Sequence, residues 1–334
     1  MKKELGIGGL LLALCIPLAL VPNSHFLSMA NLRNQAQLIG MFGIFSIGMG
    51  IVIITGGIDL SVGSVFALQG VIFSILLVEQ HWPWPLATLA VIGGVVLLGV
   101  IHGFLIAKVR LQPFIVTLCG LLIYRGVARY IANDETKGFG ESSFGLLRPI
   151  AAGNIGPVPT SFVILIVVAV IMFVVLHRSV YGRYLFAVGR NEEAAKFSGI
   201  NTHLVIGSAY ALSMLLAAIS GIILAFYTNS ISPSGHGAFY ELYCIAAAVL
   251  GGCSLRGGEG SIIGILLGTA LLQVLQNLVN LLGIPSSLNF AVMGTVILLG
   301  VLTDELLGRR VSRRGASVPA AKTASPTPST SRAV

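Results

Sequence analysis

Long apolar stretches separated by short polar connections run through most of the chain. A helix of about 20 apolar residues crosses the hydrocarbon core of a bilayer. Counted on that basis, the pattern predicts ten membrane-spanning helices, of which the eighth is short: 5–21, 36–55, 61–79, 86–106, 113–131, 160–178, 204–227, 242–254, 261–282 and 288–304. We therefore expect an all-α polytopic membrane protein of about ten helices, with a transmembrane domain over residues 1–308.

Composition supports this class. Hydrophobic residues make up 55% of the 334 residues and charged residues only 10%, whereas soluble domains carry about 25% charged residues. The net charge of +8 comes from basic residues that gather at the ends of the apolar stretches. That distribution is typical of membrane orientation and not of a surface that binds nucleic acid.

The positions of the basic residues also predict which way the chain faces. With the N-terminus inside, fifteen of the 20 Lys and Arg residues fall on the inner side, and the outer side or outer half of a span holds Arg33, Arg125, Arg129, Lys137 and Arg148. This excess predicts that both termini are cytoplasmic. Residues 309–334 are rich in Arg, Ser, Ala, Pro and Thr. We expect a disordered basic cytoplasmic tail, whose first residues either contact anionic membrane lipid or are simply solvated.

One polar motif interrupts the apolar stretch between about residues 38 and 78. Its members are glycines, serines and one acid: Gly56, Gly57, Asp59, Ser61, Gly63 and Ser64. An uncompensated Asp at the centre of a membrane helix costs about 2.5–3.5 kcal/mol. Glycines let the chain leave helical geometry there. We therefore predict a broken helix near residues 56–64 that forms part of a gate and carries a buried carboxylate, which is typical of transport proteins.

The role of the acid has two interpretations. Asp59 either shapes the break by accepting backbone N–H bonds from residues 61–63, or contacts the substrate or the gate directly. Arg125 is the available opposite charge. Glycines at 251–252 and 257–258 predict a second helix break near residues 251–261. Glu241 is expected at the outer surface, where it is solvated or meets a partner.

The longest inner loop contains a short predicted helix. Asn191 is suited to cap it, and Glu192 and Glu193 occupy its first turn, where the helix dipole favours acids. The helix continues through Ala194 and Ala195, and Gly199 is placed to end it. From the residues alone, this helix either docks against a partner or simply connects two spans.

A polar stripe marks the ninth predicted span. Gln273, Asn277 and Asn280 follow i, i+4, i+7 spacing, so they share one helix face. These residues are candidates for lining a translocation path for a polar substrate. The alternative is hydrogen bonding between helices, which the position of Gln276 on another face favours.

Motifs for covalent chemistry are missing from the sequence. The chain has no Gly-x-x-x-x-Gly-Lys-Ser/Thr phosphate loop, so any ATP hydrolysis that serves it must take place on another subunit. We assign no catalytic residue, no metal site and no cofactor, and neither His102 nor His236 has a partner at metal-ligand spacing. The four cysteines are expected to be inert, buried thiols.

Several of these stretches resemble one family of transporters. Glu193-Ala194-Ala195-x-x-x-Gly199 resembles the EAA loop through which permease subunits of bacterial ABC importers contact their ATPases. Residues 57–64 resemble the signature of the ribose-type sugar permeases within the branched-chain amino acid/ribose permease family. Further similar stretches are 182–184, 198–201, 246–255, 257–260 and 280–283, and the resemblance covers about residues 30–305.

The resemblance implies a function and a set of partners. It implies a permease subunit in the bacterial inner membrane that translocates a monosaccharide, a ribose-like pentose or a hexose. A periplasmic or extracellular sugar-binding protein would deliver the sugar, a cytoplasmic ABC ATPase would drive transport, and a second permease copy, identical or related, would complete the pore. The alternatives are an ion-coupled secondary transporter and an ABC permease for branched-chain amino acids.

Overall fold

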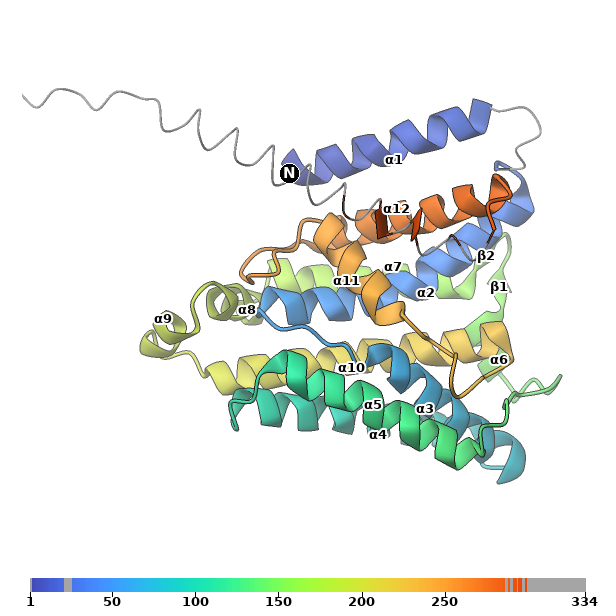
Figure 1. Cartoon of the computed structure of the whole chain (residues 1–334), viewed down its shortest axis with the longest axis horizontal. Helices are drawn as coiled ribbons and strands as arrows, with labels where there is room; N and C mark the ends of the chain where they lie inside the picture. Colours follow the sequence, from blue (N-terminus) through green and yellow to red (C-terminus); the bar gives the residue numbers. More distant parts are fainter. Residues whose placement is uncertain are drawn as a thin grey trace, which may run out of the picture.

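The computed structural model describes residues 2–20, residues 26–285 and six single residues between 288 and 298. Figure 1 shows a bundle of long helices with two short helices, α8 and α9, beyond one end. The helices are α1 Lys2–Leu20, α2 Met29–Ile54, α3 Val62–Ser74, α4 Trp84–Ala107, α5 Pro113–Ala132, α6 Leu147–Ala152, α7 Thr160–His177, α8 Val180–Arg190, α9 Glu192–Phe197, α10 Thr202–Thr228, α11 Tyr240–Leu250 and α12 Ile262–Leu281. A π-helix, η1, extends α3 over Ile75–Glu79, and β1 Asn154–Ile155 pairs antiparallel with β2 Val158–Pro159.

The all-α polytopic class is confirmed. Seven helices in the described part of the chain are long and apolar enough to cross a membrane: α2, α3 with η1, α4, α5, α7, α10 and α12. The predicted first span corresponds to α1, and the predicted eighth span corresponds to α11, which has only 11 residues. The tenth, 288–304, falls almost wholly outside the described residues, as does the tail 309–334. The total of ten spans therefore stays a prediction.

Helix α2 forms the centre of the bundle. It packs against α7, α10, α11 and α12, and 89% of its apolar stretch is buried, compared with 28–33% of α4, α5 and α7. Small residues allow this packing, because an ideal Cβ on Gly48 would lie only 3.0 Å from the Cα atom of Ser213 in α10. The less buried helices turn apolar faces outward, toward lipid or a protein partner.

Two groups of three helices repeat the same packing. In the first group α2 is followed by α3 and α4, and in the second α10 is followed by α11 and α12. Helices α3 and α4 pack against α10, while α11 and α12 pack against α2. The shorter members, α3 and α11, both begin inside the bundle, away from its ends (Figure 1). The interruption that shortens α11 therefore precedes it, at residues 229–239, and the predicted second break at 251–261 is the connection between α11 and α12.

Candidate functional site

The break after α2 is made by its last turn and two glycines. The Thr55 hydroxyl donates to the carbonyl of Val52 at 2.7 Å, and the Gly57 N–H donates to the same carbonyl at 3.1 Å. Between them Gly56 has φ of +84°, a left-handed conformation that glycine adopts at little cost. The chain then runs from the end of α2 back into the bundle, where α3 begins (Figure 1).

Asp59 holds this segment in shape. Its Oδ1 accepts the Ser61 N–H at 2.9 Å and the Ser61 hydroxyl at 2.6 Å. The Ser64 hydroxyl in turn donates to the Ser61 carbonyl at 2.8 Å. All three side chains are fully buried. The contacts are those of an Asx turn, while Asp59 Oδ2 accepts no hydrogen bond from the described residues.

Three polar rings lie near this carboxylate. It interacts electrostatically with His102 of α4, Tyr124 of α5 and Tyr210 of α10. The Tyr124 hydroxyl and His102 Nε2 are hydrogen-bonded at 2.8 Å. The Tyr210 hydroxyl lies against Gly57, where a Cβ would overlap it. Four separate segments thus build one buried polar cluster.

Arg125 contacts backbone carbonyls in place of Asp59. From α5 its guanidinium donates to Gly63 O at 3.1 Å and to His236 O at 2.7 Å. These carbonyls belong to the first turn of α3 and to the loop before α11. The sequence left open whether Arg125 meets Asp59, and among the described residues its guanidinium contacts these carbonyls instead. A guanidinium presents several donors in one plane, so a single Arg bridges both segments.

The first turns of α3 and α11 meet at this bridge. A Cβ on Gly63 would overlap both the Glu241 carboxylate and the Gly237 carbonyl. Glu241 is only 7% exposed, so the expectation that it is solvated is wrong. The N-terminal end of a helix favours negative charge, and here Asp59 and Glu241 lie at two such ends.

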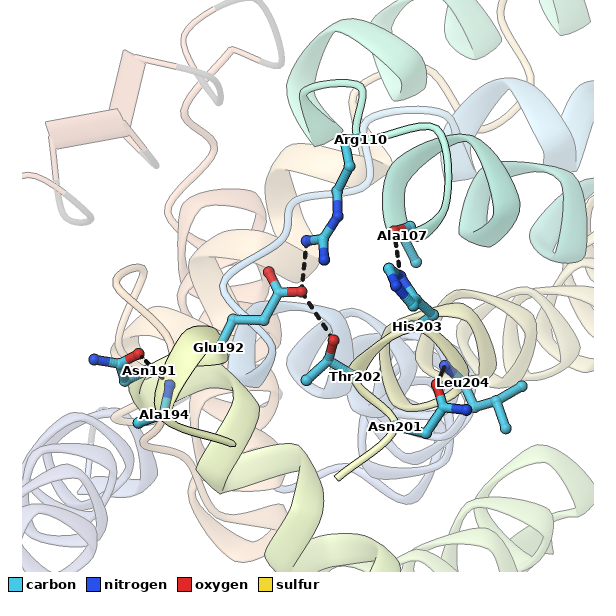
Figure 2. Close-up of polar contacts among 9 residues, drawn as sticks. All are labelled: Ala107, Arg110, Asn191, Glu192, Ala194, Asn201, Thr202, His203 and Leu204. Carbon is cyan, nitrogen blue, oxygen red and sulfur yellow. Dashed lines mark hydrogen bonds and ion pairs between the residues drawn. The ribbon is translucent and has the colours of Figure 1, made fainter. Parts of the chain in front are cut away.

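The predicted inner helix is α9, and it has the predicted caps. Asn191 Oδ1 accepts the Ala194 N–H at 2.9 Å (Figure 2). At the other end Gly199 has φ of +82°. The preceding helix, α8, buries Leu185 and Val188 against the bundle, which leaves α9 projecting from it (Figure 1).

The two acids of α9 face different surroundings. Glu192 Oε1 accepts from the Arg110 guanidinium at 2.5 Å and from the Thr202 hydroxyl at 3.1 Å, so it ties α9 to the α4–α5 connection and to α10 (Figure 2). Glu193 is exposed. Phe197, which the sequence reasoning did not select, is 92% exposed. An aromatic residue four positions after Glu193 in a polar loop was the signal that could have identified it.

The remaining residues of the predicted coupling set also divide by exposure. Ala194 is exposed, whereas Ala195 is 5% exposed and belongs to the core. On the bundle side, His203 Nδ1 and the Ala107 carbonyl are 2.6 Å apart (Figure 2). The exposed residues of α9 are therefore Glu193, Ala194, Lys196 and Phe197, on a base that is fixed to the bundle.

The polar stripe of α12 is mostly enclosed. Gln273 and Asn277 are 2% and 6% exposed, while Asn280 is exposed. Gln273 Oε1 and Asn277 Nδ2 have no hydrogen-bond partner among the described residues. Helix α12 packs against α1, α2 and α11, so the stripe lies within the chain, and its role in a path or in packing stays a prediction.

Metal-ligating side chains and cysteines were the remaining candidates for a functional site. Over residues 2–20 and 26–285, no three His, Cys, Asp or Glu side chains lie together as a metal site would require. Cys244 and Cys253 are buried, but Cys119 on α5 is exposed and Cys15 is partly so. The expectation of four buried thiols holds for two of them.

Comparison with known proteins identifies the family. Residues 31–301 match the family described as "Branched-chain amino acid transport system / permease component". The ribose import permease of Escherichia coli K12 is 40% identical over 304 residues, covering 88% of this chain and 92% of the relative. The ribose import permease of Bacillus subtilis is 37% identical, covering 84% of this chain and 87% of the relative. The xylose transport system permease of Escherichia coli K12 is 30% identical, covering 85% and 87%.

No solved structure matches the chain significantly. The sequence match nevertheless takes in the helix break, the buried polar cluster and the capped α9. The chain therefore belongs to the family of ABC transporter permease components that includes the ribose and branched-chain amino acid permeases.

Proposed function

We propose that this chain is the membrane-spanning permease subunit of an ABC importer for a monosaccharide. The observation that carries the proposal is α9, a capped helix of six residues with an exposed Phe197 and a base tied down through Glu192. Exposed aromatic residues that become buried at an interface are typical binding hot spots. We infer that α9 docks into a cytoplasmic ATPase, which hydrolyses ATP on behalf of this chain.

The other partners follow from the same function. A periplasmic or extracellular binding protein delivers the sugar, and a second permease copy, identical or related, completes the path. The outward apolar faces of α4, α5 and α7 are available to that copy and to membrane lipid. The chain lies in the bacterial inner membrane, with α9 and both termini on the cytoplasmic side.

Transport in this proposal is alternating access by a two-state change. The broken helices α3 and α11 meet where Arg125 bridges Gly63 and His236, and that meeting point serves as the gate. Interrupted helices with their N-terminal ends near the membrane midplane are a recurrent way to build such a site. ATP binding and hydrolysis on the partner move α9, and the gate residues respond.

Co-purification with the ATPase tests the docking surface. The variants Phe197→Ala and Glu193→Arg alter the exposed side of α9, and Leu204→Ala removes an apolar side chain that is 69% exposed at the start of α10. A hot spot is worth at least about 2 kcal/mol, so Phe197→Ala should weaken ATPase binding about thirtyfold. Leu204→Ala should bind as the wild type does. Equal binding by all variants would refute docking through α9.

Uptake in proteoliposomes tests the substrate and the energy source. The relatives are named for ribose and xylose, and a fructose import permease of Rhizobium meliloti is 32% identical. ATP-dependent uptake of one of these sugars in the presence of the binding protein is expected. The family description names branched-chain amino acids, so leucine uptake is the second candidate. Uptake driven by an ion gradient without ATPase would establish the secondary transporter instead.

A further inference from the structure

Three segments far apart in sequence meet as bare backbone at the end of the bundle that carries α9. They are the end of α2, the last turn of α8 and the α11–α12 connection. The Gly258 N–H donates to the Ile54 carbonyl at 2.8 Å. A Cβ on Gly189 would overlap that carbonyl, and a Cβ on Gly257 would lie 2.6 Å from the Gly189 carbonyl and 2.9 Å from the Gly56 nitrogen. We call this contact the glycine junction: Gly56, Gly189, Gly257 and Gly258.

The junction lies between α9 and the segments that adjoin α3 and α11. Gly189 lies two residues before Asn191, the residue that caps α9. Gly56 opens the segment that leads into α3, and Gly257 and Gly258 follow α11. The first turn of α3, at Gly63, contacts Gly237, which lies just before α11. One contact therefore connects α9 to both helices of the gate.

The packing at the junction is suited to transmit displacement. Flexible side chains absorb small shifts by changing rotamer, but here the nearest neighbours of Gly189 and Gly257 are all backbone atoms. Close-packed interiors pass strain on to their neighbours. Gly257 and Gly258 have φ of +82° and +74°, a region that glycine adopts readily and other residues rarely do. Glycine is therefore the residue type that permits this close contact between backbone segments.

We propose that the glycine junction carries the movement of α9 to α3 and α11, and that Gly189 and Gly258 are positioning residues for transport. This rests on the proposed function, because it requires an ATPase at α9. The junction itself touches neither sugar nor ATPase. The junction makes α3 and α11 move whenever α9 moves.

The test lengthens the connection between α9 and the junction with flexible residues. Two glycines inserted between Arg190 and Asn191 keep the exposed surface of α9, its contacts through Glu192 and the packing of Gly189. They loosen only the link between α9 and the junction. Gly189→Ala disturbs the junction directly. The matched controls are Gly94→Ala on α4, where a Cβ meets nothing within 4 Å, and the same two-glycine insertion after the exposed Glu141. The complex is reconstituted with its ATPase and binding protein, and sugar uptake is measured per ATP hydrolysed.

The expected result is a change in the ratio of the two activities. The insertion variant should bind the ATPase and hydrolyse ATP, while sugar uptake per ATP falls about tenfold, within the usual range of coupling free energies between sites. A general loss of folding lowers both activities together and leaves the ratio unchanged.

Two outcomes overturn the proposal in distinguishable ways. An unchanged ratio in the insertion variant, or an equal fall in the controls, overturns the junction alone, because the complex still forms. A wild-type chain that binds no ATPase overturns the proposed function, and the junction with it.

Discussion

Asp59→Ala and Asp59→Asn separate the two roles of the buried carboxylate. The alanine variant removes Oδ1 and with it two hydrogen bonds, from the Ser61 N–H at 2.9 Å and the Ser61 hydroxyl at 2.6 Å. Both donors are fully buried. Hydrogen bonds to a charged group are worth about 1.5–3 kcal/mol each, so the loss is about 3–6 kcal/mol. The asparagine variant keeps an acceptor at the same place, and its cost should be below about 1.5 kcal/mol, the value of an ordinary hydrogen bond.

The assay is unfolding of the purified chain in mixed micelles titrated with SDS, followed by helical circular dichroism. Ser61→Ala is the matched control, because it removes only the hydroxyl and leaves the backbone bond to Asp59. Its cost should fall between those of the two Asp59 variants. An Asn variant as unstable as the Ala variant would show that charge, and not the acceptor, holds the break. An Ala variant as stable as the wild type would refute the reasoning altogether.

Three further predictions concern the surroundings of the break. Gly57→Ala should lower the thermal unfolding midpoint because its Cβ overlaps the Tyr210 hydroxyl, and adding Tyr210→Phe should recover part of the loss; a double variant no better than the single one would contradict this. Arg125→Lys should unfold at a lower temperature than the wild type, since an ammonium cannot reproduce the planar donors that reach Gly63 and His236, and an unchanged midpoint would show that the bridge does not stabilise the fold. A membrane-permeant maleimide should label Cys119 in the native chain but label Cys244 only after denaturation, as mass spectrometry would show; native labelling of Cys244 would place it outside the core.

The features that were predictable from sequence are local in the chain. Runs of about 20 apolar residues predicted the seven long apolar helices found among the described residues. Two glycines and an acid within nine residues predicted the break at 56–64. The caps of α9 were also predictable, because Asn191 and Gly199 act on their own neighbours.

The features that were missed depend on residues far apart in sequence. Arg125 reaches His236 across 111 positions, and Arg110 reaches Glu192 across 82. Periodicity says which face of a helix is polar but not which segment that face meets. The short α11 was predicted in its place, yet its origin inside the bundle and the burial of Glu241 require the packing of α3 against it.

The enclosure of α2 has a consequence for biosynthesis. Its partners are made long after it: the Ser220 hydroxyl, which donates to the Met41 carbonyl at 2.8 Å, is synthesised 179 residues later. A nascent chain grows at about 5–20 residues per second, so α2 waits roughly ten seconds or more in lipid before α10 arrives. During that interval α2 lacks α10, one of the helices that cover it in the finished protein. The strongly apolar surface of α2 is thus compatible with two successive surroundings. It first contacts lipid acyl chains and later packs against the other helices of its own chain.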